Sequence, residues 1–426
     1  MHDTIAASEN LLSNTLLQLI VMIAAARLGN LAMRRLGQPG VVGEIVAGLL
    51  LGPSLLGSVF PGLSNAVFGA HPSAPIIVLS QIGLVLLMFQ IGMDFEFSHL
   101  ACRRNRNAGV AIAAMSAAIP FLLGMLFGRM SAPFLAPDMD VLGYSLFLGA
   151  GLAITAMPIL GRILQEFGLA RSELGVVAIT AAAINDVAGW VLLAAISAYA
   201  AARLSVAGLV WQVAGLCALL GGMWFVARRL VSRLLAVYPV RDGMLPPNLM
   251  MAALCLAFIA GLCTGALGIF TIFGGFLTGL LFHHDRAFVE AWRRQVGRFV
   301  LIFFLPVFFT FTGLRTNIWG LDSVSDCAWM ALLLAAAVLG KMIPVYATGR
   351  LAGFDSRESS ILGVLMNTRA LMELIVLNIG FDMGVIPLKV FTMLVIMAVV
   401  TTVMAGPLLR VLLRRMGHAI PQGVEA

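Results

Sequence analysis

The stretch TAAAINDVAGWVLL, from Thr180 to Leu193, carries Asn185 and Asp186 within an otherwise apolar run. Apolar residues continue for more than one helical turn on both sides, which predicts Asp186 near the middle of a membrane-spanning helix. A carboxylate at that depth costs at least about 2.5 kcal/mol on insertion scales. The pair could be a helix-packing contact satisfied by neighbouring hydroxyls and amides. We favour a functional carboxylate, because ionisable groups inside membranes mostly mark ion or substrate pathways.

The composition is that of an integral membrane protein. Of the 426 residues, 61% are hydrophobic and 11% charged, whereas soluble domains carry about 25% charged residues. Repeated apolar runs of spanning length predict an all-α polytopic protein rather than a barrel. The first ten residues lack Lys and Arg, so we expect a retained first helix and no cleaved signal peptide. The five cysteines show no CxxC and no metal-ligand spacing, which favours membrane-core thiols over a disulfide framework.

Apolar runs between polar breaks predict about 13 transmembrane helices. They are Leu11–Met33, Val41–Gly57, Pro75–Phe95, Ala108–Met130, Val141–Gln165, Ser172–Ala201, Ser205–Leu235, Pro246–Gly265, Leu267–Phe282, Gly297–Gly313, Cys327–Gly349, Ser359–Gly380 and Ile386–Arg415. Most Arg residues fall in alternate loops, which predicts an external N-terminus and a cytoplasmic C-terminus. The net charge of +7 therefore indicates an anionic membrane surface rather than nucleic acid. With no long loop and few residues after Arg415, we expect one transmembrane domain over residues 1–426 and no soluble C-terminal regulatory domain.

A weak internal repeat links the two halves. VGEIVAGLL (Val42 to Leu50) resembles FGGFLTGLL (Phe273 to Leu281), and FQIGMDF (Phe89 to Phe95) resembles TFTGLRT (Thr310 to Thr316), in the same order. The predicted topology places the two copies of the first pair, VGEIVAGLL and FGGFLTGLL, in opposite orientations. We therefore expect inverted repeats over about residues 41–201 and 267–415, an arrangement typical of transporters with a midplane site.

Two helices are interrupted at corresponding positions after those motifs. The first contains Thr155 and Pro158, and a proline in mid-helix removes a backbone donor and clashes with the preceding turn. The second contains Asn367 and Thr368, which are poor guests in hydrocarbon. Pro158 alone could be an ordinary kink. Together the two breaks predict half-helix dipoles and freed carbonyls directed at a shared cavity.

Few other charges lie inside the membrane. Lys341 could extend its side chain to the cytoplasmic surface, although about two turns of largely apolar sequence before the next Arg argue against this. Arg369 and Glu373 are spaced i, i+4 and could neutralise each other as a structural pair. Glu44, near the start of its helix, is interpreted as a packing or gating residue.

These features favour an antiporter. A buried carboxylate balanced between desolvation and a nearby cation such as Lys341 can hold a proton or a small monovalent cation, but not both. The alternatives are a cation channel or a ligand-gated K+ efflux pathway, but no carbonyl-lined filter sequence is present. An intramembrane aspartyl protease would need two close carboxylates, so no enzyme and no cofactor are expected. His283 and His284 with Asp285 could bind a metal, but a solvated polar loop is the favoured interpretation and no metal is expected.

The chain resembles the second family of monovalent cation:proton antiporters, which includes bacterial Na+ or K+/H+ exchangers and plant cation/H+ exchangers. The stretches that carry the resemblance are GQPGVVGEIVAGLLLGPSLLG (Gly37 to Gly57), GLVLLMFQIGMDFE (Gly83 to Glu96), AITAMPILGRILQE (Ala153 to Glu166), AAAINDVAGWVLLA (Ala181 to Ala194) and MNTRALMELIVLNIG (Met366 to Gly380). The last is most similar to the plant-type exchangers and their bacterial relatives. Relatives with a gated K+ efflux function carry a C-terminal nucleotide-binding domain, which this sequence does not show.

The resemblance implies the sodium/proton antiporter fold, with two crossed discontinuous helices in a mobile core half and a dimerisation half. It implies a homodimer, in the bacterial inner membrane, that moves Na+ or K+ against H+. Asp186 would carry the cation or proton beside Asn185, Thr155 would line the site, and Lys341 would be the nearby basic residue. Family members with Asp-Asp at this place are associated with electrogenic exchange and those with Asn-Asp commonly with electroneutral exchange. Asn185 together with Lys341 leaves the stoichiometry open.

Overall fold

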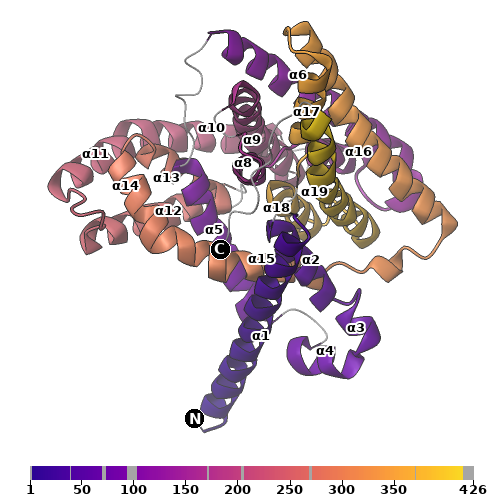
Figure 1. Ribbon diagram of the computed structural model, residues 1–426. Helices are drawn as coiled ribbons and strands as arrows, with labels where there is room; N and C mark the ends of the chain where they lie inside the picture. Colours follow the sequence, from indigo (N-terminus) through magenta and orange to yellow (C-terminus); the bar gives the residue numbers. More distant parts are fainter. Residues whose placement is uncertain are drawn as a thin grey trace. The chain divides into compact units, whose positions relative to one another are not determined.

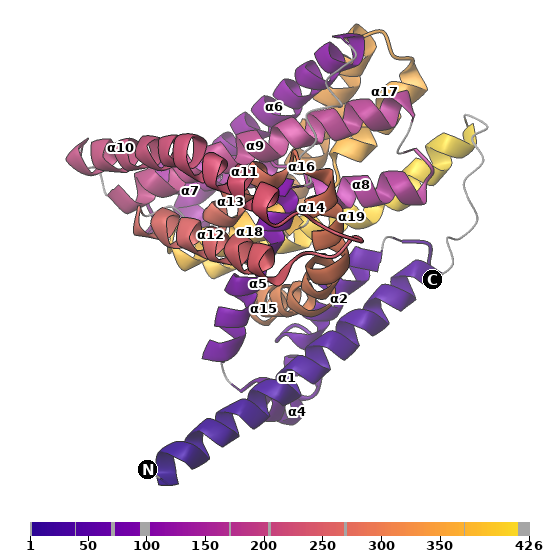
Figure 2. The same ribbon diagram turned by 90° about the vertical axis from the view of Figure 1, so that its left-hand side faces the viewer.

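The computed structural model describes residues 2–38, 40–69, 73–93, 103–169, 172–202, 206–267, 271–369 and 371–415. Within these ranges all repetitive secondary structure is helical (Figures 1 and 2). The one β-type pairing in them is an isolated bridge between Arg241 and Met244. The all-α fold predicted from the sequence is confirmed.

The helices of the first half are α1 (His2–Arg35), α2 (Gly40–Leu51), α3 (Leu56–Val59), α4 (Pro61–Phe68), α5 (Ala74–Met93), α6 (Arg103–Leu135), α7 (Val141–Ala153), α8 (Met157–Glu166), α9 (Glu173–Ala202), α10 (Val206–Gly222), the π-helical turn η2 (Met223–Ala227) and α11 (Arg228–Val237). Those of the second half are α12 (Pro247–Ala266), α13 (Thr271–Phe282), α14 (Arg286–Trp292), the π-helical turns η3 (Arg293–Gly297) and η4 (Val300–Phe304), α15 (Leu305–Leu314), the 3-10 turn η5 (Ile318–Gly320), α16 (Val324–Leu351), α17 (Ser356–Met366), α18 (Leu371–Asp382) and α19 (Leu388–Arg415). The short connections from α7 to α8 and from α17 to α18 mark the interrupted helices.

Ten helices in the described ranges are long and apolar enough to cross a membrane. They are Glu9–Arg35, Gly40–Val59, Ala74–Met93, Asn107–Leu135, Glu173–Ser197, Ala214–Val237, Pro247–Ala266, Val300–Gly320, Val324–Leu351 and Leu388–Arg415. Two shorter apolar helices, α7 and α13, fall below the length of about 20 residues that a full crossing requires. The protein is therefore an integral membrane protein, while the count of thirteen spans stays a prediction.

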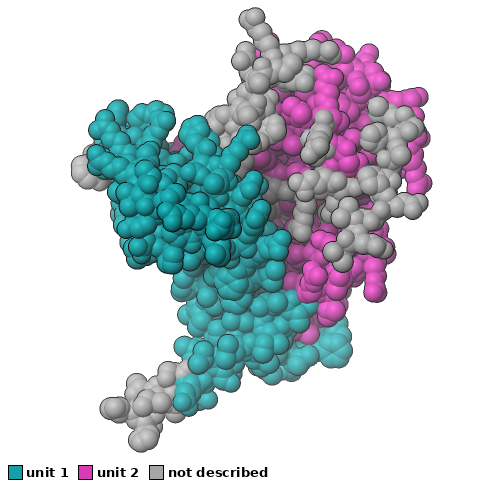
Figure 3. All heavy atoms as spheres, turned by 60° about the vertical axis from the view of Figure 1, so that its left-hand side comes forward, with its two compact units in different colours: residues 1–25, 59–96, 197–314 teal, residues 26–58, 97–196, 315–426 magenta. Residues whose placement is uncertain are grey.

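The chain folds into two compact units, coloured separately in Figure 3. Unit 1 comprises residues 1–25, 59–96 and 197–314, and unit 2 comprises residues 26–58, 97–196 and 315–426. Each unit is built from three separate stretches of sequence. All the polar and charged residues that the sequence singled out near Asp186 belong to unit 2.

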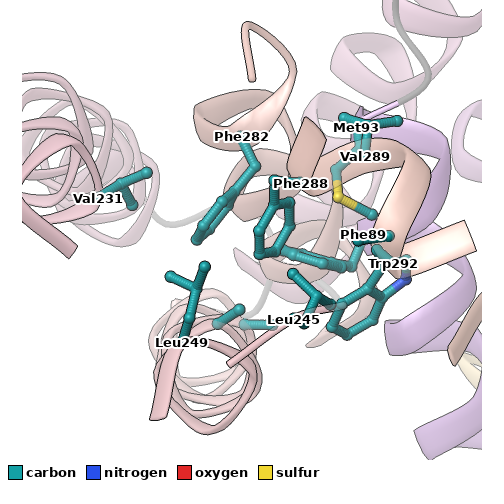
Figure 4. Packing of buried hydrophobic residues seen from close by; sticks show 12 residues of the cluster. Phe89, Met93, Val231, Leu245, Leu249, Phe282, Phe288, Val289 and Trp292 are labelled. Carbon is teal, nitrogen blue, oxygen red and sulfur yellow. The ribbon is translucent and has the colours of Figure 1, made fainter. Parts of the chain in front are cut away.

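Unit 1 is held together by aromatic packing and by close helix contacts (Figure 4). Phe89 of α5 lies edge-on to Phe282 and to Trp292, with ring centroids 5.6 and 4.7 Å apart. A Cβ at Gly279 of α13 would lie 2.1 Å from the carbonyl oxygen of Phe89. Only glycine lets α5 and α13 approach so closely, so the FGGFLTGLL motif serves helix packing here.

Unit 2 has a similar glycine-mediated helix contact, made by the VGEIVAGLL copy of the motif in α2. A Cβ at Gly43 of α2 would lie 2.0 Å from the carbonyl oxygen of Gly29 in α1. Elsewhere in the unit α6 packs along α7 and α16, and α16 also packs along α17. These contacts bring the two interrupted helices beside α16 and position the candidate site.

Candidate functional site

The first interrupted helix exposes the carbonyl end of α7. Its backbone leaves the helical path at Ile154 to Ala156 and resumes with Met157, the first residue of α8. Pro158 therefore lies in the first turn of α8, where its missing N–H would have no intrahelical partner anyway. The last four carbonyls of a helix lack partners within it and carry a partial negative charge.

Two buried cations cover those carbonyls. Arg369 donates from Nη1 to the carbonyl of Gly151 at 2.9 Å and from Nη2 to that of Leu152 at 2.8 Å. Lys341 of α16 donates from Nζ to the carbonyls of Ala153 at 2.5 Å and Ile154 at 2.9 Å. Both side chains are fully buried. Lys341 therefore does not extend to the surface; it stabilises the open end of α7.

The second interrupted helix meets the first at its break. α17 ends at Met366 and α18 begins at Leu371, so Asn367 and Thr368 lie in the link. The backbone N–H of Ala156 donates to the carbonyl of Thr368 at 3.3 Å, and the Thr155 hydroxyl donates to that of Met366 at 3.3 Å. The two breaks thus satisfy each other's backbone groups, which gives the pair of discontinuous helices expected from the sequence.

Arg369 connects these elements. It lies in the link between α17 and α18, and its guanidinium is 3.5 Å from a carboxylate oxygen of Glu373 on α18. Glu373 is fully buried, and among the described residues its oxygens accept no hydrogen bond within normal geometry. The i, i+4 ion pair predicted from the sequence is present. In addition Arg369 reaches across to the end of α7, a contact that the spacing does not reveal.

Asn185 and Asp186 lie on α9 and are each 2% exposed. The Asn185 amide donates from Nδ2 to Ser116 Oγ on α6 at 2.8 Å and to Thr155 Oγ1 at 3.4 Å. Neither carboxylate oxygen of Asp186 has a hydrogen-bond partner among the described residues. The groups that act on the Asp186 carboxyl are the backbone N–H of Met157, at the start of α8, and the side chain of Lys341. A buried carboxylate with so few donors is costly unless something else binds it.

A cavity of about 230 Å³ leads to Asn185 within unit 2. It is lined by Ala114, Ala117, Ala118, Phe121, Ala153, Ile154, Asn185, Ala188, Gly189 and Leu192. Asn185 is the single polar side chain among these lining residues. A small polar species in this cavity would therefore meet the Asn185 amide before any other side-chain hydrogen-bonding group.

The remaining residues considered from the sequence lie outside this cluster. Glu44 of α2 accepts a 2.6 Å hydrogen bond from Asn30 of α1, in agreement with a packing role. His283 and His284 follow α13 in unit 1, with their rings 3.6 Å apart. Burial and the neighbouring His284 lower the pKa of His283. The contact of its ring with the Leu280 carbonyl acts in the opposite direction but does not outweigh burial. No group of three potential metal ligands occurs within the described residues.

Ser116 contacts Asn185, but no pattern in the sequence indicates it as a site residue. It is one of two serines in α6, the other being Ser131, and it is fully buried. Its partner Asn185 lies 69 residues away along the chain. A hydroxyl within one helix more often bonds to its own backbone, as Ser116 also does with the carbonyl of Ala113. Only the tertiary contact distinguishes it.

Comparisons with known proteins agree with this architecture. The sequence profile described as "Sodium/hydrogen exchanger, transmembrane" matches residues 19–415. The chain is 36% identical to the Na+/H+ antiporter NhaS4 of Synechocystis, over 93% of this chain and 97% of that protein. It is 32% identical to cation/H+ antiporter 18 of Arabidopsis thaliana and 27% identical to K+/H+ antiporter 1 of Saccharomyces cerevisiae, with 96% and 94% of this chain aligned. It spans about half the length of these two, 50% and 46%.

A solved structure shows the same fold. The sodium proton antiporter MjNhaP1 of Methanocaldococcus jannaschii superposes with a TM-score of 0.58, at 15% identity, over 93% of this chain and 96% of that one. At that identity the likeness concerns the arrangement of helices alone. It agrees with the antiporter fold expected from the sequence.

Proposed function

The chain belongs to the family of transmembrane sodium/hydrogen exchangers, and from this premise we propose that it exchanges a monovalent cation, Na+ or K+, for H+. Asp186 is the carboxylate that binds both ions in turn. The observation that carries the proposal is the state of Asp186: it is 2% exposed and has no hydrogen-bond partner among the described residues. Its relatives are named as Na+/H+, K+/H+ and cation/H+ antiporters, which supports the choice of ions.

The charges around the two breaks support a shared site. When all four groups are ionised, the two positive charges of Lys341 and Arg369 balance the two negative charges of Asp186 and Glu373, and the cluster has a net charge of zero. Adding either one proton or one monovalent cation to Asp186 gives the same net charge of +1. In a low-dielectric interior the electrostatic cost depends strongly on net charge. Because the proton-bound and cation-bound sites have the same net charge, the two ions can compete for one carboxylate.

The proposed mechanism is alternating access with a site that stays intact. Asp186, Asn185, Thr155, Lys341 and the Arg369–Glu373 pair all belong to unit 2. Hydrogen bonds join Asn185 to Thr155, Thr155 to the end of α17, and Lys341 to the end of α7. Asp186 follows Asn185 in α9, so the cluster can move as one body between the two membrane faces. Midplane sites between broken helices work in this way in secondary transporters.

The wider setting is part of the same proposal. We infer a homodimer in the bacterial inner membrane, with the N-terminus outside and the C-terminus cytoplasmic, as the alternating Arg-rich loops favour. We also infer two inverted repeats within a single transmembrane domain. The order α7, α8, α9 resembles the order α17, α18, α19, since in each case a break is followed by a long helix.

The test is transport by purified protein in proteoliposomes with an internal pH dye. Na+ or K+ added outside should move protons in the wild type, and Asp186→Asn should abolish this movement because the amide cannot take up a proton. Asp138→Asn, the same change at an exposed loop position, serves as the matched control and should transport normally. Exchange that persists in Asp186→Asn would disprove the assignment of the shared carboxylate. Currents far above carrier turnover would instead indicate a channel.

A further inference from the structure

Ser116 of α6 contacts Asn185, although no sequence pattern indicates this contact. Its hydroxyl lies on α6 and is fully buried, and its hydrogen is used on the carbonyl of Ala113 at 3.1 Å. The oxygen of Ser116 therefore has lone pairs to offer to a neighbour. That neighbour is Asn185, whose Nδ2 lies 2.8 Å away. The contact is the shorter of the two that Asn185 makes through Nδ2.

Thr155 fixes the same orientation of the amide. Its hydroxyl hydrogen goes to the carbonyl of Met366, the last residue of α17, which has no partner within its own helix. The Thr155 oxygen must then accept, and Nδ2 of Asn185 lies 3.4 Å from it. An amide turned the other way would present its oxygen to two hydroxyl oxygens. Both hydroxyls would have to rotate, and the Met366 carbonyl would lose its donor.

The consequence is an oriented amide oxygen. With both N–H groups of the Asn185 amide engaged, Oδ1 is left buried and, among the described residues, without a partner. Asn185 is also the single polar side chain lining the 230 Å³ cavity. A carbonyl oxygen is a good ligand for a hard monovalent cation, whereas an NH2 group repels it.

We propose that Ser116 is a positioning residue that, together with Thr155, holds the Asn185 amide so that its carbonyl oxygen faces the transported cation. This rests on the proposed cation/proton exchange and adds to it the residue that makes Asn185 a cation ligand. Without Ser116 the amide can turn, and its NH2 group would then oppose the cation on its way to Asp186. The loss should appear in cation affinity and not in the maximal rate.

The experiment measures apparent KM and maximal rate for Na+ and K+ in proteoliposomes at fixed pH. The variants are Ser116→Ala, which removes the acceptor, and Ser116→Cys, which keeps a weak acceptor at similar size. Ser131→Ala is the matched control: Ser131 is also a fully buried serine on α6 and bonds to the Gly128 carbonyl and to Tyr144, away from Asn185. We expect KM to rise about three- to tenfold in Ser116→Ala, the effect of one hydrogen bond. Ser116→Cys should give an intermediate KM, and the maximal rate should stay within about twofold.

Each outcome decides the proposal. A KM for Ser116→Ala equal to that of Ser131→Ala, or a fall in maximal rate with unchanged KM, overturns it. If Ser116→Ala does not fold, the comparison of serine with cysteine decides it, since an unchanged KM in Ser116→Cys contradicts the role of the acceptor. Wild-type protein that moves no protons in response to either cation would refute the proposed exchange itself, which separates the two failures.

Discussion

At the end of α7, four successive carbonyls from Gly151 to Ile154 accept hydrogen bonds from the charged groups of Arg369 and Lys341. At the end of α17 the hydrogen-bond donors to the carbonyls are uncharged. The carbonyl of Met366 accepts from the Thr155 hydroxyl, and that of Leu365 accepts from the hydroxyl and N–H of Thr368. Both ends are buried in the same unit and both interrupt an apolar helix.

The two helix ends differ in the charge of the groups that cover them. The α7 end is covered by two basic side chains, Lys341 and Arg369, which also act on the carboxyl groups of Asp186 and Glu373. The α17 end receives hydroxyl and amide groups that change no charge, and one of these, Thr155, also contacts Asn185. One helix end is therefore covered by basic side chains, and the other by neutral hydroxyl and backbone N–H groups.

The largest effect is expected from Arg369→Leu. The substitution leaves Glu373 as a buried carboxylate without its partner and uncovers the carbonyls of Gly151 and Leu152. Breaking a buried ion pair from one side costs about 3–5 kcal/mol, so the melting temperature in detergent should fall steeply. The control is Arg294→Leu, which breaks the exposed ion pair of Arg294 with Glu290. Because exposed ion pairs contribute about 0–1 kcal/mol, this variant should lose little stability.

A double substitution separates the two costs of Arg369→Leu, the unpaired carboxylate of Glu373 and the uncovered carbonyls of α7. Adding Glu373→Gln to Arg369→Leu removes the unpaired carboxylate and should recover part of the lost stability, because the two residues are coupled. If the double variant is no more stable than Arg369→Leu, the cost comes from the uncovered α7 carbonyls and not from the ion pair.

A smaller but still large effect is expected from Lys341→Met, which preserves length and volume while removing the charge. The carbonyls of Ala153 and Ile154 lose their donors, at about 1–3 kcal/mol for an unsatisfied buried group. The melting temperature should lie between those of the wild type and Arg369→Leu. A value equal to that of the wild type would contradict the claim that charge is needed to cover the α7 end.

Part of this comparison could be predicted from the sequence. The midplane pair Asn185–Asp186, the breaks near Thr155 and Asn367, and the i, i+4 ion pair follow from local patterns of polarity and spacing. The contacts of Arg369 with Gly151, 218 residues away, depend on how the two breaks cross. No spacing rule within one helix reveals such a partner. For the same reason Ser116 was missed and Lys341 was predicted only as a nearby cation, not as the donor to α7.

Helix boundaries were less predictable where the helical geometry changes. The sequence predicted a helix from Gly297 to Gly313, but the structure continues helically from Arg286 through two π-helical turns to Leu314. The charged residues of η3 suggested a loop between two helices. A π-helical turn instead accommodates an extra residue without ending the helix. Polarity alone does not distinguish a surface helix from a loop.

The smallest effect is expected at the neutral break, from Thr155→Val compared with Thr368→Val. Both replace a fully buried hydroxyl with a methyl group of similar size. Thr155→Val leaves one buried carbonyl, that of Met366, without a donor and should cost about 1–3 kcal/mol, whereas Lys341→Met leaves two such carbonyls. Thr368→Val should cost less, because the Leu365 carbonyl keeps the backbone N–H of Thr368 as a donor. Melting temperatures measured in the same detergent test this order. If Thr155→Val destabilises as much as Lys341→Met, charge gives no advantage over a hydroxyl at a buried helix end, and the distinction between the two breaks fails.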